Sequence, residues 1–102
     1  MIRFEWDTAK ARTNRRKHGI DFEIARQVFH DPDALVEQDR IESGKVRWQT
    51  IGAVGGILLL LVAHTVEFDG DEPDETIRII SARRANRKER LRYEEERQEN
   101  YS

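Results

Sequence analysis

The side chains best suited to binding or catalysis are the cations that cluster around a short apolar segment near the C-terminus. Residues 78–92 hold seven Lys and Arg side chains and one acidic side chain, Glu89. Arg78 precedes the β-branched pair Ile79–Ile80, and the other six cations follow it, where the sequence becomes helix-forming. Like charges at neighbouring helical positions repel by roughly 0.2–0.5 kcal/mol per pair, so this concentration does not serve stability. It favours an anionic target outside the chain, and polyphosphate is the commonest such target.

Three histidines are the other candidates for chemistry, because an imidazole exchanges protons near neutral pH. His18 stands beside a lysine and a glycine, His30 beside an aspartate, and His64 near the end of a long apolar run. Each also has a structural alternative: His18 can contact the last carbonyls of a helix, His64 can fill a polar gap, and His30 can lie in solvent. The chain has no cysteine and no His, Asp and Glu group at metal-ligand spacing. We therefore expect neither a metal nor another cofactor.

Charge is sharply segregated along the chain. The formal net charge is −2, yet residues 1–20 carry +4 and residues 77–93 carry +6, against −6 in residues 67–76. Such a chain is expected to present one basic and one acidic surface. Its overall charge is therefore a poor guide to its partner.

The length of 102 residues predicts a single domain spanning residues 1–102. The N-terminus lacks the charged-then-apolar pattern of a signal peptide. The longest apolar run, residues 57–63, is seven residues long, whereas a membrane helix needs roughly 20. We expect a cytoplasmic protein without membrane contact, and the lack of cysteine fits a reducing compartment.

The first part of the chain reads as a strand followed by two helices. Apolar and polar residues alternate over residues 2–6, which predicts a half-buried strand. Asp7 is a suitable N-cap for a helix over residues 8–18, and Gly19 stands where a left-handed residue ends many helices. Asp21 is expected to cap a second helix, which an Asp-Pro pair ends. The apolar face of that helix consists of Phe22, Ala25, Val28 and Phe29.

The second part alternates between strands and turns and ends in a helix. Strands are predicted over residues 34–39, 46–53, 57–66 and 76–82. Gly55–Gly56 is typical of a hairpin turn, and the uninterrupted apolar strand after it should be central and buried on both faces. Asn86 is placed to cap the last helix, with Glu89 completing a capping box. The acidic loop 67–75 and the polar tail 97–102 are expected to be solvated.

The predicted order is therefore β-α-α-β-β-β-β-α. Four consecutive strands with short connections favour an antiparallel sheet, with both N-terminal helices on one face. The predicted fold class is α+β: an antiparallel sheet with two N-terminal helices and one C-terminal helix.

Several short motifs, taken together, resemble those of the BrnT family. The most specific combination is Lys17-His18-Gly19 near the N-terminus with Ile80-Ser81-Ala82-Arg83 near the C-terminus, at this separation. The others are Phe4-Glu5-Trp6-Asp7, Phe29-x-Asp31-Pro32, Arg47-x-x-x-Ile51-Gly52, His64-Thr65 and Glu89-Arg90-x-x-Tyr93. The resemblance extends from about residue 2 to residue 96. The loop 67–75 is longer and more acidic than the family pattern leads us to expect, and the second helix begins with Asp21 and has Ile24 where a Glu often stands.

The resemblance implies a toxin of a type II toxin–antitoxin pair, with a RelE-like fold and a ribonuclease activity that halts translation. It implies a small BrnA-type antitoxin as the partner, in a complex with two copies of each chain. The antitoxin's DNA-binding part would repress the shared operon, so the toxin would meet operon DNA only indirectly.

Cleaving RNA without a metal requires moving protons at the 2′-hydroxyl and the leaving oxygen, and stabilising the charge of the phosphorane. An arginine fork suits the phosphorane, and Arg83, where the last strand meets the last helix, is the first candidate. Arg47, at the start of a strand in a family motif, is the second. His64 or His18 would transfer protons, and Lys17 would hold the RNA backbone. Because strand and helix ends can share one rim of a sheet, these side chains could converge on one phosphate. The structural alternative for Arg83 is an ion pair with the acidic stretch.

The other cations of residues 78–92 are predicted to follow the RNA backbone or to bind a partner. These are Arg84, Arg87, Lys88, Arg90 and Arg92. Tyr93 could stack on a base or pack with Leu91 against the sheet. Two further classes would use the same cations: a binding module without catalysis, for nucleic acid or an acidic protein segment, and a structural component of a toxin–antitoxin DNA complex. Only the histidines and the resemblance favour catalysis.

Overall fold

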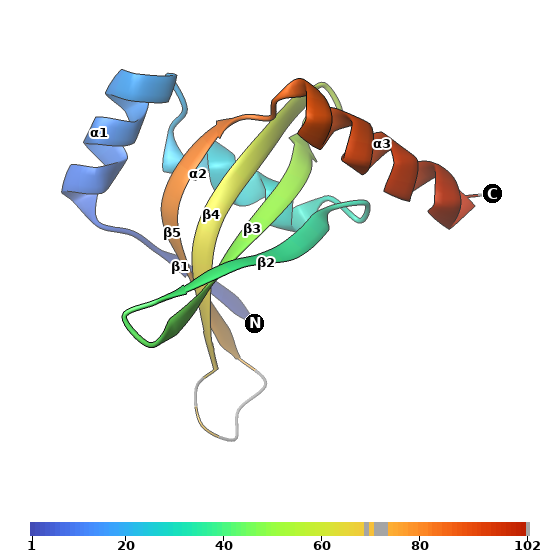
Figure 1. The fold of residues 1–102 in the computed structure, drawn as a ribbon. Helices are drawn as coiled ribbons and strands as arrows, with labels where there is room; N and C mark the ends of the chain where they lie inside the picture. Colours follow the sequence, from blue (N-terminus) through green and yellow to red (C-terminus); the bar gives the residue numbers. More distant parts are fainter. Residues whose placement is uncertain (69, 71–73, 102) are drawn as a thin grey trace.

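A five-stranded mixed sheet with the order β1-β5-β4-β3-β2 forms the centre of the molecule (Figure 1). The computed structural model describes residues 1–68, 70 and 74–101. The strands are β1 (Ile2–Glu5), β2 (Leu35–Glu42), β3 (Lys45–Val54), β4 (Leu58–Phe68) and β5 (Glu75–Arg84). The helices are α1 (Thr8–His18), α2 (Phe22–Ala25), the 3₁₀ helix η1 (Arg26–His30) and α3 (Arg87–Tyr101).

The two segments that were expected to be solvated are described only in part. Residues 69 and 71–73 of the predicted acidic loop lie outside the described residues, and so does residue 102 of the predicted tail. The rest of the tail up to residue 101 continues α3 instead of leaving it. This difference is explained by composition, because residues 94–99 contain neither Gly nor Pro and are mostly Glu, Arg and Gln, which are good helix formers.

The prediction of a purely antiparallel sheet is wrong at one edge. Strands β2 to β5 pair antiparallel as expected, but β1 runs parallel to β5, from Ile2 beside Glu75 to Glu5 beside Arg78. Only a tight hairpin forces neighbouring strands to be antiparallel, and the helices and strands between β1 and β5 remove that constraint. Because β1 covers only the first part of β5, the outer edge of β5 near Ala82 is left for α1.

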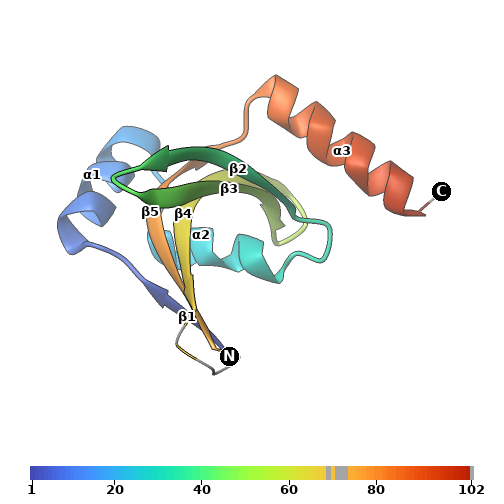
Figure 2. The same ribbon diagram turned by 60° about the horizontal axis from the view of Figure 1, so that its bottom comes forward.

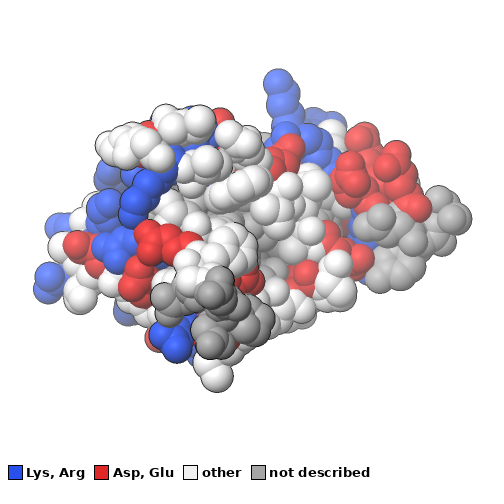
Figure 3. All heavy atoms as spheres, turned by 90° about the horizontal axis from the view of Figure 1, so that it is seen from below, with Lys and Arg blue, Asp and Glu red and all other residues white. Residues whose placement is uncertain are grey.

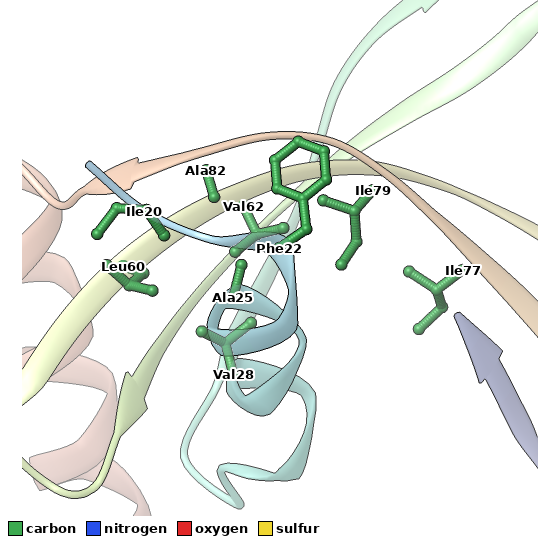
Figure 4. Packing of buried hydrophobic residues seen from close by; sticks show 9 residues of the cluster. All are labelled: Ile20, Phe22, Ala25, Val28, Leu60, Val62, Ile77, Ile79 and Ala82. Carbon is green, nitrogen blue, oxygen red and sulfur yellow. The ribbon is translucent and has the colours of Figure 1, made fainter. Parts of the chain in front are cut away.

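Strand β4 is central and buried on both faces, as predicted. Leu60 and Val62 pack under α2 and η1 with Phe22, Ala25 and Val28 (Figure 4). The alternate residues of β4 point to the opposite face, where Leu59 and Leu61 form a smaller cluster with Ile51, Ala85 and Tyr93. Figure 2 shows the consequence: α2 and η1 lie on one side of the sheet and α3 lies on the other.

Helix α1 differs from the prediction, because it stands beside β5 and does not cover the sheet face as α2 and η1 do (Figure 1). The buried Asn14 fixes it there. Its amide nitrogen donates to the carbonyls of Ile20, at 3.0 Å, and Ala82, at 2.9 Å, and its oxygen accepts from the Ala82 N–H at 3.0 Å. Asn14 thus satisfies the backbone carbonyl and N–H of Ala82, which would otherwise need a further strand as their partner.

The helix-capping predictions are confirmed at α1 and α3. Asp7 accepts a hydrogen bond from the Lys10 N–H, and Gly19 ends α1 in the left-handed region with φ of 69°. At α3, the side chains of Asn86 and Glu89 accept from each other's backbone N–H groups at 2.9 and 2.8 Å, which is the predicted capping box. The predicted cap by Asp21 is only half correct, since its backbone carbonyl accepts from the helix but its side chain does not.

The second helix was predicted as one continuous helix but changes to a 3₁₀ turn after Ala25. The change brings Val28 against Gly52 of β3, where a Cβ atom would lie 2.8 Å from the Val28 Cβ and 2.9 Å from the Val28 carbonyl oxygen. We expect Gly52→Ala to destabilise the protein by about 1–3 kcal/mol, because the backbone oxygen cannot rotate away. Urea unfolding measures this, with the exposed Gln38→Ala of β2 as a control expected to stay within about 0.5 kcal/mol. A loss no larger than that of the control would contradict the close approach.

Candidate nucleic-acid interface

The cations without an acidic partner gather at one end of the molecule. Ten of the 18 Lys and Arg side chains make ion pairs within the described part of the chain, and eight do not. The unpaired group on α1 consists of Lys10, Arg12, Arg16 and Lys17, and the group at the β5–α3 junction consists of Arg84, Arg87, Lys88 and Arg90. Figure 3 shows the charge separation, with Lys and Arg gathered over α1 at one side and Asp and Glu over the far end of α3.

The first group lies on the helix that packs against β5, and the second group begins at the end of that strand. Lys17 and His18 line a hollow of about 320 Å³ together with Ile80 and Ser81 of β5. Arg84 ends the same strand, and α3 begins three residues later. We call this surface the basic end and define it by Lys17, His18, Arg84, Arg87 and Lys88. Its side chains are exposed, so it is suited to a polyanion such as an RNA backbone.

Arg83 lies at the basic end but is engaged by a side chain of its own chain. Its Nη1 and Nη2 atoms donate to the two carboxylate oxygens of Glu89 at 2.8 and 2.9 Å. This bond raises the pKa of Arg83 and lowers that of Glu89. The predicted ion pair with the acidic stretch is not found among the described residues, and the partner of Arg83 is the capping-box carboxylate of Glu89 instead. The Arg83 side chain is still 38% exposed, so a phosphate can reach it by sharing or displacing Glu89.

His64 is buried and does not lie near the basic end. It is 2% exposed and faces α2 and η1, with its ring against the edge of Phe29 at 4.8 Å between centroids. A hydrogen bond of 2.7 Å joins its Nε2 to the Thr50 hydroxyl, and its Nδ1 has no partner among the described residues. Burial lowers the pKa of His64 to about 4, so the ring is neutral at pH 7. In this conformation His64 cannot contact a substrate, and the structural alternative describes it better.

The five predicted catalytic residues do not converge. Arg83 and Arg47 lie on the same face of the sheet. Arg83 is paired with Leu61 of β4, whereas Arg47 lies beside a position of β4 that is four residues further along that strand. That places their backbones about 13 Å apart along the strands and about 10 Å apart across them. Arg47 is also paired with Glu42 at 3.1 Å. Lys17, His18 and Arg83 belong to the same end of the molecule, whereas Arg47 and His64 lie elsewhere.

Two of the predicted RNA-binding residues serve the fold. Tyr93 is buried, and its hydroxyl donates to Asp31 Oδ2 at 2.6 Å. Burial, followed by this hydrogen bond, raises the pKa of Tyr93. Tyr93 therefore packs against the sheet, as the packing alternative proposed, but the 52% exposed Leu91 does not pack with it. Arg92 pairs with Glu37 at 3.0 Å. Arg84, Arg87, Lys88 and Arg90 stay exposed.

The residue that anchors α3 is Asp31, and this role was not predicted from the sequence. Asp31 accepts from the Ala53 N–H at 2.8 Å and the Asp33 N–H at 2.9 Å as well as from Tyr93, so one carboxylate joins η1, β3 and α3. Its pKa is lowered because these hydrogen bonds outweigh its partial burial. The motifs containing Asp31 and Tyr93 were both noticed, but no local pattern shows that two residues 62 positions apart will meet.

Neither a metal cluster nor a membrane span is found in the part of the chain that the structure describes. No three His, Cys, Asp or Glu side chains there are grouped so as to hold a metal ion. No helix among the same residues is long and apolar enough to cross a membrane.

The buried His64 makes a prediction about acid stability. Its pKa is about 4 in the folded protein and about 6.5 when unfolded, so between these values only the unfolded chain binds the proton. Stability should therefore fall as the pH drops from about 6.5 to about 4, by roughly 3 kcal/mol in all. Urea unfolding across this range measures the effect. His64→Gln, which keeps a polar group for Thr50, should remove this pH dependence, and exposed His30→Gln should retain it; equal slopes in both would contradict the assignment.

The fold and the basic end together define a small α+β protein with exposed, unpaired cations beside the end of its last strand. The model of a family described as the ribonuclease toxin BrnT of type II toxin–antitoxin systems matches residues 6–89. The chain therefore belongs to the BrnT family, and the resemblance found in the sequence is confirmed.

The crystal structure of the Brucella abortus ribonuclease toxin BrnT is similar to this chain, with a TM-score of 0.63 and 26% sequence identity. The match covers 85% of this chain and 100% of that one. No curated protein gives a significant match.

Proposed function

We propose that this chain is a metal-independent endoribonuclease toxin that cleaves RNA and thereby inhibits translation. The observation that carries the proposal is the basic end of a chain of the BrnT family, where exposed cations without acidic partners follow Arg83 along the chain and lie on α1 beside the same strand. A BrnA-type antitoxin would neutralise it in a complex with two copies of each chain, and the toxin would meet operon DNA only through that antitoxin. The proposal includes a RelE-like fold and action in the cytoplasm, where the RNA substrate is.

The geometry supports a division of roles along the basic end. Arg83 is the candidate for the scissile phosphate, because its side chain is held at the end of a strand. His18 is the candidate for proton transfer, because it is exposed and lines a hollow with Lys17, which can hold the next phosphate. Arg84, Arg87, Lys88 and Arg90 would follow the backbone, and Arg47 would contact RNA further along the same sheet face. His64 would support the site only through the core.

A second function is favoured by one observation. The Arg83 fork is occupied by Glu89 and His64 is buried, so no pair of proton-transfer groups stands beside Arg83 in this conformation. A protein that binds nucleic acid or an acidic partner through the basic end, without cleaving, needs no such pair. This binding module is the alternative to the enzyme.

Expression of the chain without a partner decides between the two functions. We expect growth arrest with degraded cellular RNA, and cleavage of purified RNA with EDTA present. Arg83→Ala, purified alongside, controls for a contaminating nuclease. RNA that stays intact both in cells and in vitro, while still bound by the protein, would establish the binding module. Cleavage that EDTA abolishes would contradict metal independence.

Binding to RNA should depend on phosphate contacts at the start of α3. Arg87→Ala and Lys88→Ala should weaken affinity for all sequences alike, and each should reduce the log–log salt slope by about 0.7 for single strands. Fluorescence anisotropy at several salt concentrations with an inactive Arg83→Ala background measures the slope. Arg26→Ala and Arg40→Ala remove equal charge from surfaces where each arginine is paired with Glu23 or Glu42, and should change the slope less. An unchanged slope in the Arg87/Lys88 double variant would show that these side chains do not meet phosphate.

A further inference from the structure

A groove of about 950 Å³ lies between α3 and the turn that joins β3 to β4. The α3 bank is formed by Arg87, Arg90, Leu91 and Glu94. Their spacing of three, four and seven residues places them on one face of the helix, over two successive turns. The opposite bank is the turn, with Ile57 just after its two glycines.

The position of α3 above this groove is fixed by polar contacts. Tyr93 is bonded to Asp31 beneath the helix, and Arg97 approaches Asp33 at 3.6 Å. On the other side, Arg92 holds Glu37 of β2. The polar side chains of the floor named here therefore already have partners, and the exposed apolar side chains of the groove stand on its two banks.

The banks expose apolar side chains that the free protein does not use. Ile57 is 90% exposed and Leu91 is 52% exposed, and both line the groove from opposite sides. Pairs of large exposed apolar residues flanking one concave surface mark protein-binding sites more often than isolated ones do. They fit the apolar side of an amphipathic segment laid along α3.

The charged side chains that line the groove indicate which kind of segment it can bind. Arg87 and Arg90 make no ion pair within the described residues, whereas Asp31 and Asp33 on the floor are already engaged. The unpaired charge on the first turn of α3 is therefore positive, and Glu94, one turn further along the same face, is an acidic side chain without an ion pair among the described residues. Another exposed apolar area, around Val46 and Phe68, lacks this feature, because the lysine lining it, Lys45, is paired with Glu67 at 2.9 Å.

We propose that this groove receives an acidic amphipathic segment of the antitoxin, with its apolar side on Ile57 and Leu91 and its carboxylates on Arg87 and Arg90. The inference rests on the proposed toxin function and names the surface through which the partner acts. Because Arg87 belongs both to the groove and to the basic end, the bound segment would cover part of the RNA-binding surface. Neutralisation would then result from exclusion of RNA, with the toxin still folded.

The test is rescue from toxicity by the co-expressed cognate antitoxin. Ile57→Asp and Leu91→Asp each place a carboxylate on an exposed apolar bank without touching the buried core. Both variants should arrest growth like the parent, which also shows that they fold, but the antitoxin should no longer restore growth. We expect the affinity for the antitoxin to fall at least 10-fold. Ile41→Asp, an equally drastic change at an exposed isoleucine of β2, should be rescued like the parent.

The outcomes separate this proposal from the proposed function. If the parent protein does not arrest growth, the toxin function fails; affinity for the antitoxin then tests the groove by itself. If both groove variants arrest growth and are rescued normally, the groove proposal is overturned and the toxin function stands. If they lose RNA cleavage but keep antitoxin affinity, RNA occupies the groove, which also overturns it. Hydrogen exchange of the parent complex gives an independent check: protection is expected at residues 55–59 and 87–94, and its absence at both would contradict the proposal.

Discussion

Arg83→Lys should abolish growth arrest while leaving a folded protein that still binds its antitoxin. Lysine keeps the positive charge but loses the planar fork that contacts two oxygens of one phosphate. The loss of one such donor typically lowers the rate of the chemical step by about 100-fold or more. Single-turnover cleavage of a defined RNA measures the effect, and anisotropy shows whether general attraction for RNA survives.

Glu89 provides the control for a purely structural effect of that substitution. It binds Arg83 and also caps α3 by accepting from the Asn86 N–H. Glu89→Gln keeps an oxygen for the cap but weakens the hold on Arg83, so the protein should stay folded and retain more activity than Arg83→Lys. Arg47→Lys should be nearly as active as the parent, because Arg47 lies far from the basic end. If Arg83→Lys is as toxic as the parent and Arg47→Lys is not, the phosphate clamp lies on β3.

His18→Ala should lower RNA cleavage by about 10²–10⁴-fold, the usual contribution of a positioned general acid or base. The pH–rate profile should lose one limb, because the group that gives or takes the proton has been removed. His64→Gln should keep both limbs, since the buried ring transfers no proton, although the variant is less stable. Thermal unfolding of both variants separates lost activity from lost folding.

The contrary result would reassign the chemistry. If His18→Ala keeps full activity and His64→Gln loses one limb of the profile, the core around Thr50 and Phe29 must open during catalysis to expose His64. If both variants keep both limbs, the protons move through lysine, tyrosine or water. In that case Lys17→Ala, at the same hollow, is the next variant to compare.

Local features of this protein were determined by the sequence alone. The N-cap at Asp7, the left-handed Gly19 and the capping box of Asn86 with Glu89 form between residues at most a few positions apart. Their hydrogen bonds and backbone angles depend on residue type and spacing, so they can be read from the chain. The central place of β4 was equally predictable, because only burial on both faces explains an uninterrupted apolar strand.

The site depends on contacts between residues far apart in sequence, and these were decided by the tertiary structure. The parallel pairing of β1 with β5 leaves an edge that Asn14 fills, and this contact sets α1, with Lys17 and His18, beside the end of β5. Strand register turned His64 toward the core and Arg83 toward the opposite face. Side chains alternate with a period of two, so the face on which a strand residue lies follows from pairing across the whole sheet. Residue types thus identified which side chains could bind RNA, and the long-range packing decided which of them stand together.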